Sequence, residues 1–403
     1  MEFFERNELL INFMLVNISS GIAVGMMNFI IPIYALSLNA TSIEIGLIKG
    51  FTGIGDLLIV LPAGFLIDYF GSRKMYSVSC IFGSLIIISI SFATNASFLL
   101  LIMLFYGIAK TIRTTSNNAD FFKHMNTIGV SKAGFFKGSI TIGSALIGPL
   151  IGGIAILAMG YTSYFVLTSA FLLLPLIIIS SRLYRENTSP VKPKIISFID
   201  TSNHYKSLTK NKLLVSATIK NGLNSAFFMT FTTFIIVLAI KDLGLSPGIA
   251  AALISIKGVS TLFVVFFGGT YLQKNNNGLY LFAYLTTIFS LLLLGIGTDS
   301  IALGIASLVN GVGTGLITLI NFTEVGNIDG EKGKIAGFFS FGNALGSITG
   351  PTLAGMIGDA LGVQAIFLAF IVPFGMLAIY TFLDRRKNRI ESENTAATMQ
   401  IME

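Results

Sequence analysis

The sequence predicts an all-α integral membrane protein with about twelve transmembrane helices in two pseudo-symmetric halves. Of its 403 residues, 53% are hydrophobic and only 11% are charged, whereas soluble proteins typically carry about 25% charged residues. About twelve spans of roughly 20 residues use about 240 residues and leave the rest for short loops and tails. The apolar runs are continuous rather than alternating, which favours helices over the strands of a β-barrel. This composition excludes a water-soluble enzyme.

Hydropathy defines the individual spans in chain order. The first six are expected at 9–33, 43–67, 75–94, 98–118, 138–160 and 164–183, and the second six at 213–240, 249–272, 279–298, 301–323, 335–358 and 363–383. Most loops are only a few residues long, so consecutive helices should pack as antiparallel hairpins. We therefore expect an N-terminal half over residues 1–183, a cytoplasmic linker over 184–212, a C-terminal half over 213–383 and a cytoplasmic tail over 384–403.

Basic residues set the orientation of these spans. If the N-terminus lies in the cytoplasm, the loop Lys and Arg residues fall on the cytoplasmic side, with Lys241 alone in an outer loop. The positive-inside rule then predicts a multi-pass protein of the inner membrane with both termini in the cytoplasm. The net charge of +7 reflects this topology rather than a basic stripe, so we expect the lipid bilayer as a partner and no nucleic acid.

Residue types that hold metals or nucleotides are sparse. Cys80 is the only cysteine, and His124 and His204 lie in predicted loops without a Cys or carboxylate cluster around them. No Walker-type phosphate loop is present in the sequence. We expect no metal site, no catalytic residues and no cofactor.

The fifth span of each half carries the same motif. Residues 148–153 read GPLIGG and residues 350–355 read GPTLAG, which places Gly148-Pro149 opposite Gly350-Pro351. Small residues at this spacing clear one helix face for close approach, and proline bends the helix. Because transporters are commonly built from such repeats, the motif predicts a solute site at the interface between two related halves.

The loop after the second span carries a family resemblance. Residues 64–74 read GFLIDYFGSRK, which resembles the signature Gly-xxx-Asp-xx-Gly-x-Arg-Lys of the major facilitator superfamily, with Gly64, Asp68, Gly71 and Arg73 at the motif positions. This resemblance implies the superfamily's fold and alternating access between two six-helix halves. Asp68 can pair with Arg73 or with a neighbouring helix end as a cytoplasmic latch; the alternative is a simple basic turn. In the second half Gln273 replaces the acid.

The paired Gly-Pro segments resemble the fifth-span motif of proton-driven exporters of the superfamily. The resemblance implies a secondary transporter that exports a small organic solute in exchange for protons and is driven by the proton gradient. The fourth span departs from these exporters, which place an Arg shortly before a Gly. Here Met103 precedes Gly107, and Lys110 and Arg113 follow it. We expect Arg113 to take over the role of that arginine.

Asp56 is the predicted proton-coupling residue. It lies in the middle of the second span, where an ionisable group is costly unless it faces a cavity or a partner. A carboxyl group that alternates between a buried and a hydrated state can take up and release a proton. The alternative is a static ion pair with Lys49 or with another base inside a span.

The predicted solute-binding residues are mostly basic. Five bases inside spans outnumber the one deep acid, which favours an anionic or zwitterionic solute. Lys110 and Arg113 are three residues apart and could hold a carboxylate or phosphate together, or could extend to the interface. Asn side chains in the first and seventh spans could bind solute or join helices. The candidates are Arg113, Lys110, Lys220, Asn224, Asn17, Lys49 and Lys257. The alternative for Lys49 and Lys257 is that either side chain reaches the outer surface.

Two other functions remain open from the sequence. A proton-coupled importer of an organic anion would have the same fold and would differ in direction. A non-transporting membrane sensor or assembly factor belongs to another class, and it would tolerate Asp56→Asn and Arg113→Ala.

Overall fold

The computed structural model describes residues 2–124, 128, 133–180, 209–268, 277–326, 328 and 332–383, and every regular element among them is a helix. The predicted tail (384–403) and residues 184–208 of the predicted linker lie outside the described residues. The all-helical fold class predicted from composition is confirmed within this part of the chain.

The first half contains six helical segments, and the fifth of these is broken. Asn95 starts one helix by accepting a hydrogen bond from the Phe98 N–H at 2.8 Å, and Thr41 forms a capping box with Glu44 at the start of another. The elements are α1 (Glu2–Ser37), α2 (Ser42–Phe70), α3 (Ser72–Ile90), α4 (Ala96–Lys123), then α6 (Ala133–Thr141), the π-helix η2 (Ile142–Ile147) and α7 (Gly148–Ala158), and finally α8 (Tyr161–Ser180).

The second half repeats this order. Asn211 and Ser246 cap its first two helices by accepting hydrogen bonds from backbone N–H groups. Its elements are α10 (Lys212–Val237) with the π-helix η3 (Leu238–Asp242), α11 (Pro247–Phe267), α12 (Asn277–Ile296), α13 (Ser300–Gly326), α14 (Lys332–Leu361) and α15 (Val363–Ala369), after which helix continues to residue 383.

Ten helical segments of the described chain are long and apolar enough to cross a membrane, or eleven if α2 counts despite its 54° bend near Pro62. The helix α14 is not among them, although its 30 residues extend about 45 Å at 1.5 Å per residue. It is rich in Gly, Ser and Thr, and these small residues let it pack closely on α10 and α2. The predicted number of spans is reached when both α2 and α14 are counted.

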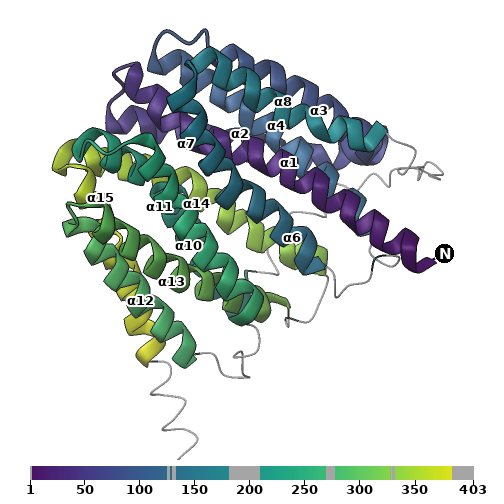
Figure 1. Cartoon of the computed structure of the whole chain (residues 1–403). Helices are drawn as coiled ribbons and strands as arrows, with labels where there is room; N and C mark the ends of the chain where they lie inside the picture. Colours follow the sequence, from purple (N-terminus) through teal and green to yellow (C-terminus); the bar gives the residue numbers. More distant parts are fainter. Residues whose placement is uncertain are drawn as a thin grey trace, which may run out of the picture.

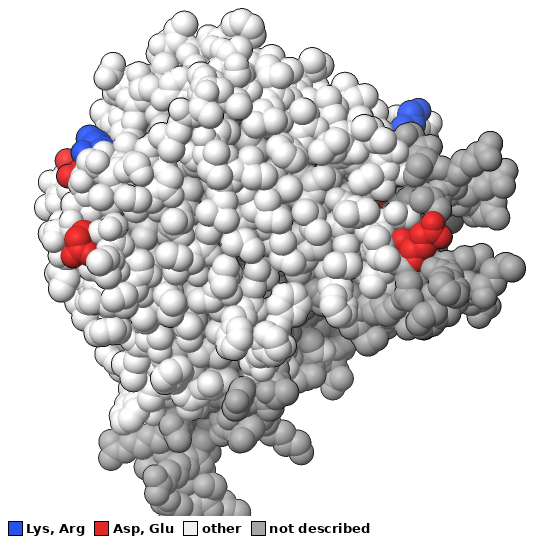
Figure 2. Space-filling view, in the orientation of Figure 1, with Lys and Arg blue, Asp and Glu red and all other residues white. Residues whose placement is uncertain are grey.

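The helices form two bundles that meet at one end. In Figure 1 the elements α1 to α8 group together, the elements α10 to α15 form a second group, and the two diverge toward the lower right. Contacts between them join α2 with α14, α7 with α11, and α1 with α10. Figure 2 shows Lys, Arg, Asp and Glu only at the two edges of the visible surface, with an uncharged zone between them. Such a zone is suited to contact with lipid.

Glycines show at which end the bundles touch. A Cβ at Gly46 would overlap the carbonyl oxygen of Pro351, and one at Gly355 would overlap that of Ser42. A Cβ at Gly64, at the other end of α2, would have no atom within 4 Å. We call the end at which α2 begins the closed face and the end at which it finishes the open face. Both ends of the described chain, residues 2 and 383, lie on the open-face side of their helices.

Candidate functional site

A cavity of about 410 Å³ lies between the two bundles. Its walls come from α1, α6, η2 and α7 of the first half and from α10, α11, α13 and α14 of the second. The polar side chains on these walls include Asn28, Asn221, Asn224, Lys257 and Thr318. The predicted location of a solute site, between related halves, therefore coincides with a real cavity.

Asp56 is held by two donors from α4. Its Oδ2 is 2.7 Å from the Lys110 ammonium, and its Oδ1 accepts a hydrogen bond from the Thr111 hydroxyl at 2.7 Å. The side chains of Asp56 and Lys110 are 22% and 23% exposed. Of the bases considered as partners, the structure selects Lys110. Lys49 instead donates to Asn28 Oδ1 at 2.6 Å, and Asn28 lines the cavity.

Lys110 and Arg113 do not share a ligand in this structure. Lys110 is occupied by Asp56, whereas Arg113 is almost fully buried and contacts Tyr106, with Tyr76 and Cys80 nearby on α3. Neither side chain lines the central cavity. A shared grip on one anion would require both side chains to move.

Lys257 lines the cavity but has no polar partner. Its side chain is 2% exposed, and its ammonium has no hydrogen-bond partner among the described residues. The nitrogen instead lies 4.0 Å from the ring centre of Phe231 and 5.0 Å from those of Phe227 and Phe228. Aromatic faces stabilise a buried cation only in part. The Lys257 ammonium therefore lacks a counter-ion among the described residues.

The two asparagine candidates lie in different places. Asn224 lines the cavity, where its amide donates to the Thr318 hydroxyl at 2.9 Å and its buried Oδ1 has no hydrogen-bond partner in the described chain. Asn17 is fully buried and donates to the Phe136 carbonyl at 2.9 Å, so it joins α1 to α6. The helix-packing interpretation fits Asn17, and the solute-binding interpretation fits Asn224.

Lys220 belongs to a polar cluster near the open face. Its ammonium is 3.8 Å from Glu324 Oε2 and 4.0 Å from the ring centre of Tyr280. The Tyr280 hydroxyl lies 2.8 Å from Glu324 Oε2 and 2.7 Å from Asn321 Oδ1. Lys220 is a predicted site residue, whereas its partner Glu324 was not predicted as one.

A repeated spacing in the sequence could have identified this cluster. Tyr76, Asn117 and Asp120 of the first half precede Tyr280, Asn321 and Glu324 of the second by the same number of positions. Lys49-Gly50 and Lys257-Gly258 are a further related pair in the second span of each half. The repeat therefore extends well beyond the Gly-Pro motif.

The residues of the predicted latch lie at the open face, and the latch is not formed in this structure. Asp68 is exposed and makes no hydrogen bond or ion pair with any described residue. Arg73 donates to the Ile179 carbonyl of α8. Gly71 has φ of 90° between α2 and α3, a conformation that favours glycine. The open space at Gly64 agrees with separated halves at this face.

The Gly-Pro motifs pack the fifth span of each half against the first. A Cβ at Gly148 would lie 2.7 Å from the Cα of Gly25 on α1, and one at Gly350 would overlap Ala226 on α10. Pro149 follows the π-helix η2, and Pro351 lies inside α14. The motif therefore has the same packing partner in both halves.

Comparisons with known proteins agree on one class. The family model of the Major Facilitator Superfamily matches residues 13–328. The chain is 27% identical over 338 residues to the multidrug resistance protein MdtG of Proteus mirabilis, covering 80% of this chain and 81% of that protein. It is 23% identical to the multi-drug resistance efflux pump PmrA of Streptococcus pneumoniae serotype 4, covering 91% and 95%. The fold is similar to that of the nucleoside transporter NupG, with a TM-score of 0.75 at 15% identity over 94% of this chain and 98% of that one.

Proposed function

Because the chain belongs to the Major Facilitator Superfamily, we propose that it exports a small organic anion or zwitterion in exchange for protons. Membership makes it a multi-pass membrane transporter of a small-molecule solute and not an enzyme. In our proposal the two bundles alternate between a state open at the face seen here and a state open at the other face. The cycle uses the proton gradient and needs no cofactor.

The contact between Asp56 and Lys110 carries the proposal. An ion pair within a membrane bundle is stable only while both groups are charged, because an unpaired charge at this depth is costly. A proton on Asp56 removes its attraction for Lys110, so proton binding and the ion pair exclude one another. The partial exposure of both side chains gives water access to the pair. Asp56 can therefore link proton uptake to a rearrangement of α2 against α4.

The charge balance inside the bundle supports an anionic or zwitterionic solute. Asp56 and Glu324 are each paired with one lysine, which leaves Lys49, Arg113 and Lys257 without carboxylate partners among the described residues. Lys257 lines the cavity, and Asn224 offers a free acceptor there. A carboxylate on Lys257 together with an amine or hydroxyl on Asn224 would satisfy both groups.

Orientation and direction complete the proposal. The loop charges favour a cytoplasmic location for the open face and for both termini, in the inner membrane. The latch residues Gly64, Asp68, Gly71 and Arg73 would then close the cytoplasmic side in the other state. The names of MdtG and PmrA and the Gly-Pro repeat favour export.

The experiment is untargeted mass spectrometry of medium and cell extract. Cells expressing the wild type, Asp56→Asn or no copy are compared, after immunoblotting shows equal amounts of protein in the membrane. We expect a compound that accumulates in the medium only with the wild type. Depletion of a compound from the medium would indicate import instead, and accumulation with Asp56→Asn equal to the wild type would contradict the coupling role.

A further inference from the structure

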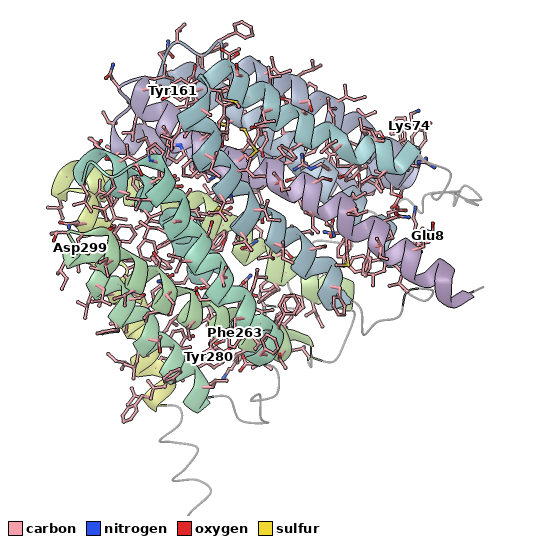
Figure 3. The ribbon with its side chains drawn as sticks, viewed as in Figure 1. Glu8, Lys74, Tyr161, Phe263, Tyr280 and Asp299 are labelled. Atoms are coloured by element: carbon pink, nitrogen blue, oxygen red, sulfur yellow. The ribbon has the colours of Figure 1, made fainter. Side chains whose placement is uncertain are left out.

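The second half contains a carboxylate whose surroundings match those of Asp56. Glu324 lies near the end of α13, with the Lys220 ammonium of α10 at 3.8 Å and the Tyr280 hydroxyl of α12 at 2.8 Å from its Oε2. The Asp56 carboxylate likewise faces one ammonium and one hydroxyl. Each half therefore holds a carboxylate between a lysine and a hydroxyl donor. The repeat position of Glu324 in the first half is a different residue, the buried Asp120, which accepts a hydrogen bond from the Ser72 hydroxyl at 3.2 Å. Figure 3 shows the labelled Tyr280 inside the second bundle, toward the end where the bundles diverge.

Both pairs have similar access to water. The side chains of Lys220 and Glu324 are 11% and 19% exposed, so the pair is neither sealed in the core nor on the open surface. Thr318, six residues before Glu324 on the same helix, lines the central cavity. Six residues of helix extend about 9 Å, which places Glu324 between the cavity and the open face.

The groups around Glu324 favour a reversible contact. The Lys220 ammonium lies 4.0 Å above the Tyr280 ring, so it keeps a cation–π partner even when the carboxylate is neutral. The Tyr280 hydroxyl can likewise keep Asn321 as its partner at 2.7 Å. The titratable side chains described on the helices that pack against α13 are Lys220 and the exposed Lys212 on α10, Lys257 on α11, Tyr280 and Tyr284 on α12, and Asp359 at the far end of α14.

From this match we infer that Glu324 is a second proton-binding site, so that each half holds one. The inference rests on the proposed function, in which Asp56 binds the first. A proton from water bonds to a carboxylate oxygen of Glu324 and neutralises it, which leaves the Lys220 ammonium with the Tyr280 ring as its remaining partner. Loss of the same proton to water on the other side restores the ion pair.

Infrared difference spectroscopy of the purified full-length protein tests this without knowledge of the solute. Spectra at acidic minus neutral pH show the C=O stretch of carboxyl groups that become protonated, and a group in an apolar site gives a resolved band. Protein labelled with ¹³C in Asp or in Glu side-chain carboxyl carbons assigns each band. We expect two bands in the wild type, one shifted by each label.

Variants then assign the bands to residues. Glu324→Gln should lose the band that belongs to Glu and keep the band that belongs to Asp, and Asp56→Asn should do the reverse. Asp299→Asn is the matched control, because this exposed carboxylate only caps the start of α13; it should lose neither band. Glu324→Asp should move the second band from the Glu label to the Asp label.

The two proposals fail in different ways. If the Glu label shifts no band, or if Glu324→Gln retains the Glu band, the second site is overturned. If instead the Asp band is absent while the Glu band is present, the role of Asp56 in the proposed function fails and that of Glu324 stands. If Glu324→Gln does not fold, the label shifts in the wild type and in Glu324→Asp still show whether Glu324 binds a proton.

Discussion

Asp359 of the second half accepts a hydrogen bond from the backbone N–H of Ser42 in the first half at 2.7 Å. Its other carboxylate oxygen accepts from the N–H of Ile43 at 3.2 Å. These amides begin α2, where the helix end attracts negative charge. The contact joins the two bundles at the closed face, beside the tight approach of Gly355 to Ser42. It therefore fastens the closed face in the state seen here.

Removal of this contact should open the closed face more often. Asp359→Ala loses two hydrogen bonds to a charged acceptor, and about 1–2 kcal/mol for a partly exposed site corresponds to a roughly 5–30-fold shift in the equilibrium. A cysteine at Met229, which lines the cavity, reports the opening through labelling by a membrane-impermeant maleimide added outside intact cells. The single native cysteine, Cys80, is buried.

Asp299→Ala is the matched control for this change. Asp299 caps α13 on its own half, with 2.9 Å to the Ile301 N–H, and makes no contact across the bundles in the described structure. Labelling of the cysteine should rise with Asp359→Ala and stay at the wild-type level with Asp299→Ala. Equal labelling in all three proteins would show that the Asp359 contact does not hold the closed face.

The Asp359 contact should not respond to pH in the physiological range. Partial burial acts to raise the pKa of Asp359, but the hydrogen bonds from Ile43 and Ser42 outweigh it and lower the pKa below its ordinary 3.8. The stabilisation is therefore present above about pH 4 and is lost only as the pH falls through the lowered pKa. The labelling ratio of Asp359→Ala to wild type should be constant between about pH 8 and about pH 5. A ratio that falls toward one across this interval would contradict the assignment.

Two glycines on α2 should respond differently to alanine. Gly46→Ala places a Cβ on the Pro351 carbonyl at the closed face, whereas Gly64→Ala enters open space at the other end. Overpacking costs about 1–3 kcal/mol, so Gly46→Ala should disfavour the state seen here and raise labelling of the same cysteine. Gly64→Ala should not raise labelling of this cysteine from outside, because the added Cβ meets no atom within 4 Å. If the latch contributes little to the equilibrium, this labelling also stays above about half of the wild-type level.

Lys257 should determine affinity for the solute. Lys257→Met keeps much of the side-chain volume and removes the charge, and a charge-assisted hydrogen bond of about 1.5–3 kcal/mol predicts a roughly 10–100-fold higher KM for the exported compound. Transport rates measured over a range of concentrations in everted vesicles check this. Lys241→Met, an exposed change near the closed face, is the control. An unchanged KM in Lys257→Met would remove this lysine from the binding site.

The ion pair in the first half should show non-additive stability. Lys110→Met leaves the Asp56 carboxylate without its ammonium, which should cost about 1–2 kcal/mol, less than the 3–5 kcal/mol of a sealed pair because both side chains are partly exposed. Adding Asp56→Asn should restore part of the loss, since no unpaired charge remains. Thermal unfolding midpoints of the two single variants and the double variant in detergent measure this. A double variant at the sum of both single losses would contradict a direct coupling.

Hydropathy predicted the helices because the preference of a span for lipid is a property of its own residues. It could not predict the partner of Asp56. Lys49 precedes Asp56 by seven residues, about 10.5 Å along one helix, and its ammonium donates to Asn28 on α1. The partner is instead fixed by the close packing of α4, where Gly107 allows contact with the Thr52 carbonyl and brings Lys110 to Asp56.

The position of Arg113 has a similar cause. Its spacing from Lys110 predicted a shared helix face, but α4 lies between α2 and α3. Lys110 therefore turns to Asp56 on α2, and Arg113 lies near Tyr76 on α3. Which neighbour each residue faces depends on the packing between helices. The spacing of residues within one helix carries no information about that packing.

Proton movement coupled to the solute is the most direct test of the central claim. Everted inner-membrane vesicles are acidified inside by respiration and monitored with a pH-sensitive dye, and the compound identified by mass spectrometry is added outside, at the cytoplasmic side. We predict that the compound dissipates the pH gradient in vesicles containing the wild type and not in those containing Asp56→Asn. Uptake of the compound by wild-type vesicles without any change in the pH gradient would contradict proton exchange.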